Sequence, residues 1–438
     1  MSKSYFIHLF IVLNILALSS CSEQKNGNFS FSREVFENIT PNQFEGSDIQ
    51  RIQSAIDAAK GTTNKVIIPS RNFNGTNLWL LDSAILLPAN MTVLLDNCTL
   101  QLSDQCRDNM FRSDNVGIGI TNPEWNENIS IIGIGEVILK GANNPRSTGD
   151  GGRTLILNPD DAKGNWRVSY GSDAGKEGKK QKGDWRNIMI LIAYVDGFKM
   201  KNINIENSHA WAVSFERTRN ADISDIRINN PEEIEINGKK VKVSNKDGID
   251  LRQGCKNFRI DNISGRSGDD FIALSSLNTG SDVYDNDNGN LNSTMVTTRK
   301  WRGPEDDTEQ VVITNISCQT KYRGVAIRAS DSASIHNVYI NGLITRDWEG
   351  HHNSILIGGK GYGKPSQPGK INNIYAMNII GDGRSLILIE APIANCYFMD
   401  GIFKGDGNQI ISYKIDKSET TNIISQNLIK ANKWHVLH

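Results

Sequence analysis

The sequence predicts an all-β fold, a right-handed, single-stranded parallel β-helix, and two observations indicate it. Segments that alternate apolar with polar residues recur along the 438-residue chain, with starts about 23 to 24 residues apart where nothing is inserted. Asparagine, glycine and isoleucine are plentiful while long amphipathic helices are scarce, which is typical of strands and turns. Because each coil of a solenoid needs only its neighbours, a chain of this length can form one continuous stack.

Six segments carry the repeat. Their apolar side chains alternate with polar ones, so each predicts a strand with one buried face. Asparagines at the corners tolerate left-handed backbone and can stack in ladders. A Greek-key sandwich is the competing fold, but Asn-Gly or Asp-Gly hairpin signals do not separate each pair of strands. The segments are 198–205, 222–228, 258–263, 311–316, 334–340 and 370–376.

The N-terminal part fits the same fold. Residues 48–59 predict one amphipathic helix, which can cap the open end of a solenoid. The first coils follow at 65–69, 86–88 and 92–96. The apolar stripe of the helix consists of Ile49, Ile52, Ala55, Ile56 and Ala59.

Three inserts interrupt the repeat. Residues 231–242 and 279–308 are polar, and residues 141–185 are rich in Gly, Asp and Lys, which predicts a long exposed loop. Loops this long are usually functional or disordered. The inserts 141–185 and 279–308 could close one end of a groove, so the sequence leaves open whether a polymer is cut internally or from its end.

Residues 1–21 predict a signal peptide, with Lys3 in its positive region and an apolar run at 5–18. The run ends in 18–21, Leu-Ser-Ser-Cys, which resembles a bacterial lipobox and implies that Cys21 is lipidated; an ordinary secretory cleavage site is the alternative. Residues 22–46 then predict a tether and lead-in, and 47–438 the β-helix domain. We expect an exported protein, in the periplasm or at the outer membrane or cell surface.

Composition limits the possible partners. Lys and Arg number 48 against 49 Asp and Glu, which argues against nucleic acid and against membrane contact other than through the lipid anchor. The remaining cysteines lack metal-site spacing, so we expect no metal or other cofactor. Cys98 and Cys106 could pair, although burial as free thiols is the stronger expectation for most cysteines. A capped solenoid need not associate, and we expect a monomer.

Two short motifs carry the chemistry. Asp247 lies in 245–250, Asn-Lys-Asp-Gly-Ile-Asp, and Asp269 with Asp270 follows about one coil later. Equivalent positions of neighbouring coils stack, so the three carboxylates should share one face. Clustered carboxylates repel each other, and glycoside hydrolysis needs such a cluster, with one carboxyl as acid and another as base. Loop turns or a structural calcium site are the alternatives.

With these motifs, the chain resembles a bacterial member of glycoside hydrolase family 28, the polygalacturonase group. Residues 208–211, Ser-His-Ala-Trp, resemble the Ser-Pro-x-Trp segment of the family. Residues 245–247 resemble its Asn-Thr-Asp, with Gly248 and Asp250 also matching, and Asp269 and Asp270 resemble its Asp-Asp. The resemblance covers about 47 to 395 and implies the β-helix fold.

The resemblance also implies roles. Asp269 corresponds to the general acid, while Asp247 and Asp270 correspond to the carboxylates that activate water for inversion of configuration. An inverting site usually holds its carboxyl groups roughly 6.5–9.5 Å apart. Asp250 is a candidate for sugar binding. The substrate implied is a polysaccharide or oligosaccharide, with a pectin- or galacturonan-like polymer favoured.

Aromatic residues near the first motif are further candidates for substrate binding. Trp211 could stack on a sugar ring or pack in the core, and binding is favoured for it on the motif match. His209 has the same two possible roles, with neither preferred.

Two departures leave the sugar open. The Gly-His-Gly of the family is replaced by 322–324, Tyr-Arg-Gly, and its cationic Arg-Ile-Lys by the uncharged 354–357. The usual grip on the substrate carboxylate is therefore missing from its usual place. Arg323 or Arg328 could replace it, since guanidinium binds carboxylate bidentately. The alternative is a substrate without a carboxylate at this place, such as a neutral sugar or a sulfated glycan.

Two rival functions remain from the sequence. A polysaccharide lyase on the same fold would use Arg or Lys as base beside an acidic calcium cluster. A non-catalytic glycan-binding lipoprotein would not need its carboxylates. Chelator sensitivity and an unsaturated product that absorbs in the ultraviolet would distinguish the lyase. Replacing Asp269 by Asn would change nothing in a binding protein, whereas a hydrolase would lose its turnover and keep binding.

Overall fold

The computed structural model describes residues 38–143, 152–155, 168–169, 178, 180–182, 184–236, 238–243, 247–280, 293–348, 352–359 and 362–431. One compact unit begins at Asn38, so residues 38–46 of the expected lead-in belong to it, and Ile39 bridges to Val66. The predicted signal peptide, Cys21 and residues 22–37 lie outside the described residues. Within the described part of the chain, no helix combines the length and apolar character that a membrane span requires.

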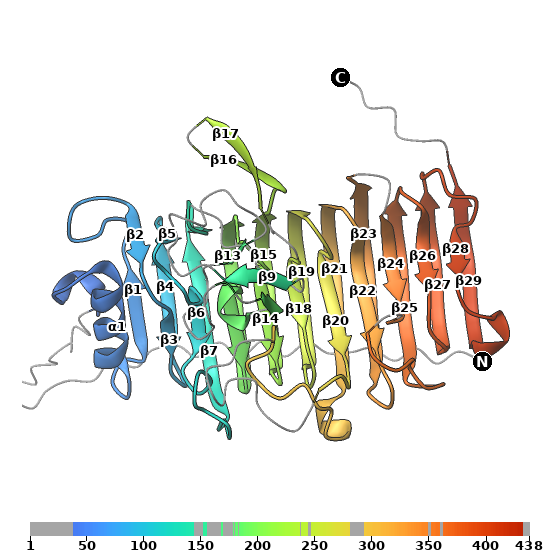
Figure 1. Ribbon diagram of the computed structural model, residues 1–438, viewed down its shortest axis with the longest axis horizontal. Helices are drawn as coiled ribbons and strands as arrows, with labels where there is room; N and C mark the ends of the chain where they lie inside the picture. The colour runs from blue at the N-terminus through green and yellow to red at the C-terminus, as the bar shows by residue number, and fades with distance from the viewer. Residues whose placement is uncertain are drawn as a thin grey trace, which may run out of the picture. The chain divides into compact units, whose positions relative to one another are not determined.

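Two long parallel sheets form the unit (Figure 1). The first contains β1 (Lys65–Ile68), β4 (Thr92–Asp96), β7 (Asn126–Ile134), β13 (Val195–Glu206), β15 (Arg219–Asn229), β19 (Lys256–Ser267), β21 (Thr308–Thr320), β23 (Ile335–Asp347), β25 (Ile371–Gly381), β27 (Ile393–Phe403) and β29 (Thr421–Lys430). Beside them lie β2 (Leu78–Leu81), β5 (Thr99–Leu102) and β8 (Ile138–Lys140).

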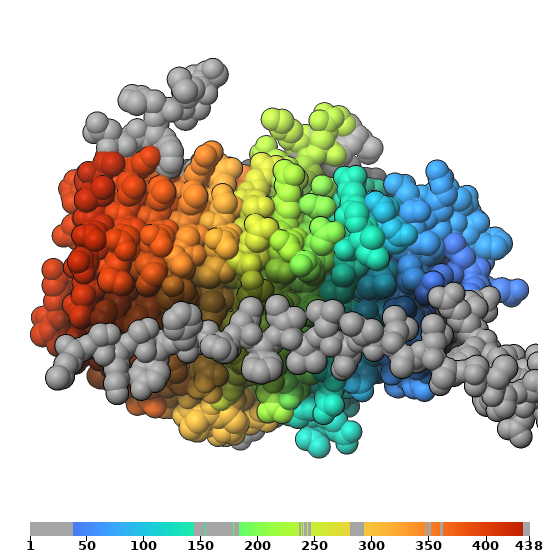
Figure 2. All heavy atoms as spheres, turned by 180° about the vertical axis from the view of Figure 1, so that it is seen from behind, coloured from blue at the N-terminus to red at the C-terminus, as the bar shows by residue number. Residues whose placement is uncertain are grey.

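The second sheet contains β3 (Ile85–Leu87), β6 (Phe111–Ser113), β12 (Ile190–Ala193), β14 (Val213–Glu216), β18 (Ile249–Leu251), β20 (Ile272–Ser276), β22 (Arg323–Ala329), β24 (Asn353–Ile357), β26 (Ser385–Ile389) and β28 (Ile411–Tyr413). Strands of the two sheets alternate along the chain, so consecutive coils stack in sequence order. The expected right-handed β-helix is therefore confirmed. The coils follow one another as bands from blue to red in Figure 2.

The predicted capping helix is confirmed as α1 (Asp48–Ala59), and its predicted stripe is buried. Ser47 and Gln50 form a capping box at its N-terminus, which satisfies backbone donors that the helix leaves open. Short 3₁₀ turns lie at η1 (Pro41–Gln43), η2 (Trp185–Asn187), η3 (Pro304–Asp306) and η4 (Lys417–Glu419).

Alternating burial along the strands builds one interior core. Inward Ile, Val and Leu side chains stack above equivalent residues of the next coil, as Ile203, Ile226, Ile263 and Ile316 do on the first sheet. Phe215 packs edge to face between Phe198 and Phe258. The five cysteines from Cys98 to Cys396 are buried free thiols, so the expected burial is confirmed and Cys98 does not pair with Cys106.

The long strands of the first sheet extend beyond the predicted segments because they turn corners. Asparagines at these corners have positive φ, and neighbouring coils join them by side-chain hydrogen bonds, as Asn262 Nδ2 donates to Asp225 Oδ1 at 2.7 Å. Asparagine suits this because its short side chain tolerates the left-handed region and bonds locally. The predicted ladders are confirmed at several corners, including Asn257 to Asn220, Asn373 to Asn337, Asn378 to Asn341 and Asn422 to Asn395.

Equivalent positions lie 22 to 24 residues apart where coils are uninterrupted, and 37 or 53 apart across the inserts. The insert 231–242 is not a plain loop, because β16 (Glu233–Ile236) and β17 (Lys239–Lys242) form an antiparallel hairpin. Within the predicted loop 141–185, β9 (Gly152–Leu155) pairs with β10 (Val168–Ser169) and β11 (Lys180–Lys182).

We expect Asn262→Ala to lower the free energy of unfolding by about 1–2 kcal/mol, because alanine resists the left-handed backbone and the bond to Asp225 is lost. Asn262→Gly also removes the bond but keeps access to positive φ, so it should cost less. Urea unfolding of the three proteins measures both changes. Equal losses for the two variants would show that the backbone conformation contributes nothing.

Candidate active site

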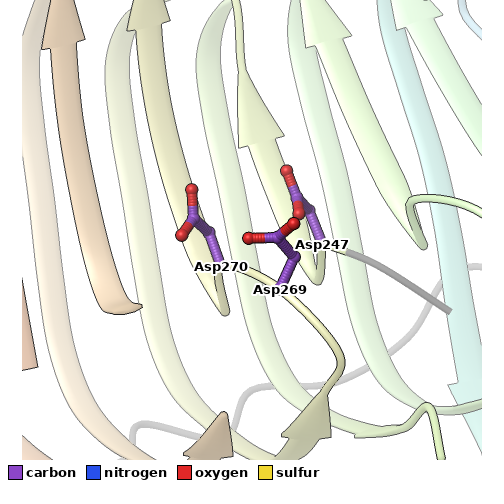
Figure 3. A group of neighbouring side chains, drawn as sticks. All are labelled: Asp247, Asp269 and Asp270. Carbon is purple, nitrogen blue, oxygen red and sulfur yellow. The ribbon is translucent and has the colours of Figure 1, made fainter. Parts of the chain in front are cut away.

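Asp247 and the pair Asp269–Asp270 lie just before β18 and β20, two neighbouring strands of the second sheet. The backbone of Gly248 donates to the carbonyl of Asp270 at 2.9 Å, which fixes the two segments side by side. A Cβ at Gly248 would lie 2.4 Å from the carbonyl oxygen of Phe271, so only glycine allows this approach. Figure 3 shows the carboxylates of Asp247 and Asp269 beside each other, with Asp270 on the neighbouring coil just before β20.

The three carboxylates lie close together. Each offers an oxygen within 4.8 Å of those of the other two, which confirms the predicted shared face. Asp247 and Asp270 are 8% and 1% exposed, while Asp269 is half-buried. The 4.8 Å limit refers to one oxygen of each residue, whereas the roughly 6.5–9.5 Å of inverting glycosidases separates whole carboxyl groups, so the expected gap stays a prediction.

Two arginines neutralise Asp270. Arg323 and Arg328, both on β22, form ion pairs with its carboxylate, and Arg323 Nη2 also lies 3.5 Å from Asp269 Oδ1. Burial is the largest single influence and lowers the pKa of each guanidinium, but the charge of Asp270, its hydrogen bond and further acidic neighbours together raise the net pKa of both. Both arginines are therefore firmly protonated, and their ion pairs with Asp270 are charge-assisted.

The aspartates line a cavity of about 380 Å³. Of the candidates from the sequence, Asp250, Trp211, Arg323 and Arg328 line it as well. Trp211 is largely buried, with the Arg252 guanidinium 4.9 Å from its ring centroid. We define this space as the aspartate cavity.

His209 lies outside the aspartate cavity. Its side chain is fully buried, and Nε2 lies 2.8 Å from the carbonyl oxygen of Ala142. A Cβ at Gly141 would lie 2.7 Å from the His209 ring, so the ring packs against this backbone. Of the two roles left open for His209, the geometry fits packing and not sugar contact.

The aspartate cavity also contains residues that the sequence did not single out. Alternation along β18 could have identified Arg252, because it points to the same side as Asp250 two positions earlier. Ser275 pairs in register with Arg328. Arg299 and Tyr362 come from loops, where no periodic signal exists.

A second cavity, of about 260 Å³, continues from the first and shares Arg323, Arg328 and Tyr362 with it. We define it as the cationic cavity, because Arg384 and Lys414 add two more cations while Glu390 is the single acidic residue among the described residues that line it. Lys414 Nζ lies 2.9 Å from Glu390 Oε1. By contrast, four aspartates and four arginines balance one another around the aspartate cavity.

The segment that replaces the cationic Arg-Ile-Lys motif of the family lies on β24. Its outward side chain there is Leu356, which lines the cationic cavity, while Ile355 and Ile357 lie in the core. The positive charge near the site therefore comes from the coils on either side of β24.

Comparison with known protein families indicates the class of enzyme. Residues 150–290 match the family described as Glycosyl hydrolases family 28. Over these residues the chain is similar to glycosyl hydrolase family 28. The matched residues include all three aspartates, and the expected enzyme class, a glycoside hydrolase, is confirmed. Arg323 and Arg328 lie beyond the match, where the sequence departs from the family pattern.

Solved structures with the same fold include polygalacturonases. The chain is 14% identical to the polygalacturonase of Erwinia carotovora ssp. carotovora, covering 90% of this chain and 93% of that one with a TM-score of 0.51. It is 13% identical to a hyperthermoactive exopolygalacturonase from Thermotoga maritima, covering 90% and 92% with a TM-score of 0.56. The fold is therefore polygalacturonase-like.

A bacteriophage protein shares the fold too. A tailspike protein of E. coli bacteriophage HK620, solved in complex with a pentasaccharide, is 12% identical, with 90% of this chain and 65% of that one covered and a TM-score of 0.55. The chain thus spans about two thirds of the tailspike. Comparison with curated proteins gives no match.

We expect Arg328→Gln to lower the free energy of unfolding by about 1–3 kcal/mol, because a buried carboxylate loses one charged partner while Arg323 remains. The matched control is Arg219→Gln, which removes a solvent-exposed pair with Asp196 and should cost less than about 1 kcal/mol. Urea unfolding measures both. A loss at Arg328 no larger than that at Arg219 would contradict the buried pairing.

Proposed function

We propose that this protein hydrolyses glycosidic bonds in an anionic polysaccharide, with a galacturonan-like polymer favoured. One observation carries the proposal: Asp247, Asp269 and Asp270 converge in a cavity large enough for sugar, within the region that is similar to family 28. Glycoside hydrolysis needs one carboxyl group to protonate the leaving oxygen and another carboxylate to act on water.

The surroundings of the aspartates suggest how the roles divide. Asp270 is buried between two guanidinium groups, whose ion pairs fix the position of its carboxyl group and suit it to orienting water. Asp269 is half-buried and lies beside Asp247, and crowded carboxylates favour protonation of one member. We therefore assign Asp269 as general acid, with Asp247 and Asp270 as the pair that orients and deprotonates water.

Inversion of configuration is part of the proposal and rests on the family resemblance. The limit of 4.8 Å applies to one oxygen from each carboxylate and not to the separation of the carboxyl groups. Nuclear magnetic resonance of the first product formed identifies its anomer, and a retained configuration would contradict the water-activating role of Asp247 and Asp270.

The cationic cavity supports an anionic substrate. Arg384 and Lys414 lie on the coils beyond the aspartates, so a polymer bound along the groove would meet them next to the reacting sugar. Guanidinium and ammonium groups bind carboxylates and sulfates through charge-assisted hydrogen bonds. Leu356 and Leu388 supply an apolar floor beneath these cations.

A lyase is the second candidate, because three carboxylates at this spacing could hold a cation. A lyase base must accept a proton from the sugar, however. The ion pairs with Asp270 raise the pKa of Arg323 and Arg328 above its ordinary value despite their burial, which disfavours both as bases. Their positive charge also opposes a divalent cation. We therefore favour hydrolysis.

Export and lipidation of Cys21 stay predictions from the sequence of residues 1–21. Membrane attachment is proposed only through that lipid.

We expect Asp269→Asn to reduce release of reducing sugar by about 10²–10⁴-fold while leaving substrate binding intact, since the amide cannot donate the required proton. Asp222→Asn, on the outer surface of the first sheet, is the control and should retain full activity. Unchanged release by Asp269→Asn would contradict the assigned acid. An unsaturated, ultraviolet-absorbing product, or activity lost to a chelator, would instead support a lyase.

We expect Arg384→Gln combined with Lys414→Gln to raise KM for polygalacturonate several-fold at low salt, because each lost cation removes a charge-assisted contact. Carboxyl-reduced polygalacturonate should be a poorer substrate, and the variant and the parent protein should have the same KM for it. A sulfated polysaccharide in the same assay separates sulfate from carboxylate recognition. Lys199→Gln, on the first sheet, is the matched control; an equal effect there would contradict a local subsite.

A further inference from the structure

The groove on the outer face of the second sheet is open along one direction of the stack and closed along the other. Leu191, Ser214 and Asp250 occupy equivalent outward positions on β12, β14 and β18. Asp250 lines the aspartate cavity, whereas Leu191 and Ser214 are fully buried. Something therefore covers this face on the coils that precede the aspartates.

In the open direction, the cavities continue from coil to coil. The aspartate cavity leads into the cationic cavity through Arg328, and the cationic cavity shares Glu390 and Lys414 with a third cavity of about 390 Å³. Together they extend from β18 past β28. A polymer has room to lie along these coils.

In the closed direction, an apolar cluster covers the sheet. It joins Leu191 and Ala193 of β12 to Trp185, Trp211 and Val296. We define Trp185, Trp211 and Val296 as the wall. On the preceding strand, the Arg112 guanidinium lies 5.2 Å from the Trp185 ring centroid, so the covered face extends at least to β6.

Buried charges hold the wall in place. Glu216, the outward residue at the end of β14, accepts hydrogen bonds from the backbone of Val296 at 3.0 Å and of Thr297 at 2.9 Å. Its neighbour Arg217 donates to Asp306 at 2.8 Å, at the far end of the same segment. All these side chains are almost fully buried, so water cannot easily replace the bonds.

The wall stands directly beside the catalytic groups. Trp211 lines the aspartate cavity together with Ser293 and Thr294, which belong to the segment that Glu216 holds. A polymer that reached the aspartates could therefore not continue past them in this direction.

We propose that this enzyme cuts its polysaccharide from a chain end and releases short products, because the wall closes the groove beside the aspartates. This inference rests on the proposed function. A chain enters from the open coils, its end stops at the wall, and the bond that meets Asp269 is always a fixed short distance from that end.

The test follows product sizes over time with polygalacturonate as probe and the full-length protein. We expect one short product from the first time points, with viscosity falling slowly relative to reducing ends. Oligogalacturonides blocked at either end provide a second readout: blocking one end should abolish cleavage and blocking the other should not. A broad ladder of intermediate oligomers at early times, or cleavage of both blocked forms, would overturn the inference.

A substitution of Glu216, which holds the wall through hydrogen bonds, tests the wall itself. Glu216→Gln keeps the shape of the side chain but weakens acceptance from Val296 and Thr297, so larger products should accompany the short one. Glu309→Gln, which alters partly exposed pairs with Lys256 and His336 on the first sheet, should leave product size unchanged. If Glu216→Gln fails to fold, cleavage of the end-blocked oligogalacturonides by the parent protein still tests the inference.

If the protein releases no reducing sugar from polygalacturonate or from any neutral or sulfated polysaccharide, the proposed function is overturned, and this inference with it.

Discussion

Parallel stacking of coils in register is the constraint on which the rest of the structure depends. Each strand of the second sheet pairs with the equivalent strand of the next coil, so β18 lies beside β20 and β20 beside β22. Parallel strands lie about 4.8 Å apart, which brings side chains at equivalent positions into contact. The carboxylates before β18 and β20 meet for this reason, and Arg323 at the start of β22 meets Asp270.

Charge compensation is the second organising feature. Three carboxylates within 4.8 Å would repel one another strongly in a partly buried site. Arg323 and Arg328 offset this repulsion and at the same time distinguish Asp270 from Asp269, which keeps more contact with solvent. The same β22 arginines border the cationic cavity, so one strand links the three aspartates to the region proposed for the anionic sugar.

Inserts between coils shape the site without altering the stack. The insert that precedes β21 carries Val296 and Thr297 back onto β14, where Glu216 binds them 80 and 81 residues away in sequence. The repeat tolerates this because each coil needs only its neighbours. The solenoid thus supplies a fixed row of functional positions, and the inserts decide which part of that row a polymer can reach.

The sequence by itself determined the coils, the capping helix and the shared face of the three aspartates, because these depend on local periodicity and on a spacing of one coil. It also indicated the asparagine corners, since the left-handed backbone selects that residue locally. Only the tertiary structure decided that Arg328 pairs with Asp270, that His209 packs against the backbone at Gly141, and that Arg384 and Lys414 supply the charge missing from β24. Those contacts join residues on different coils and inserts, and no short-range pattern encodes the distance between them.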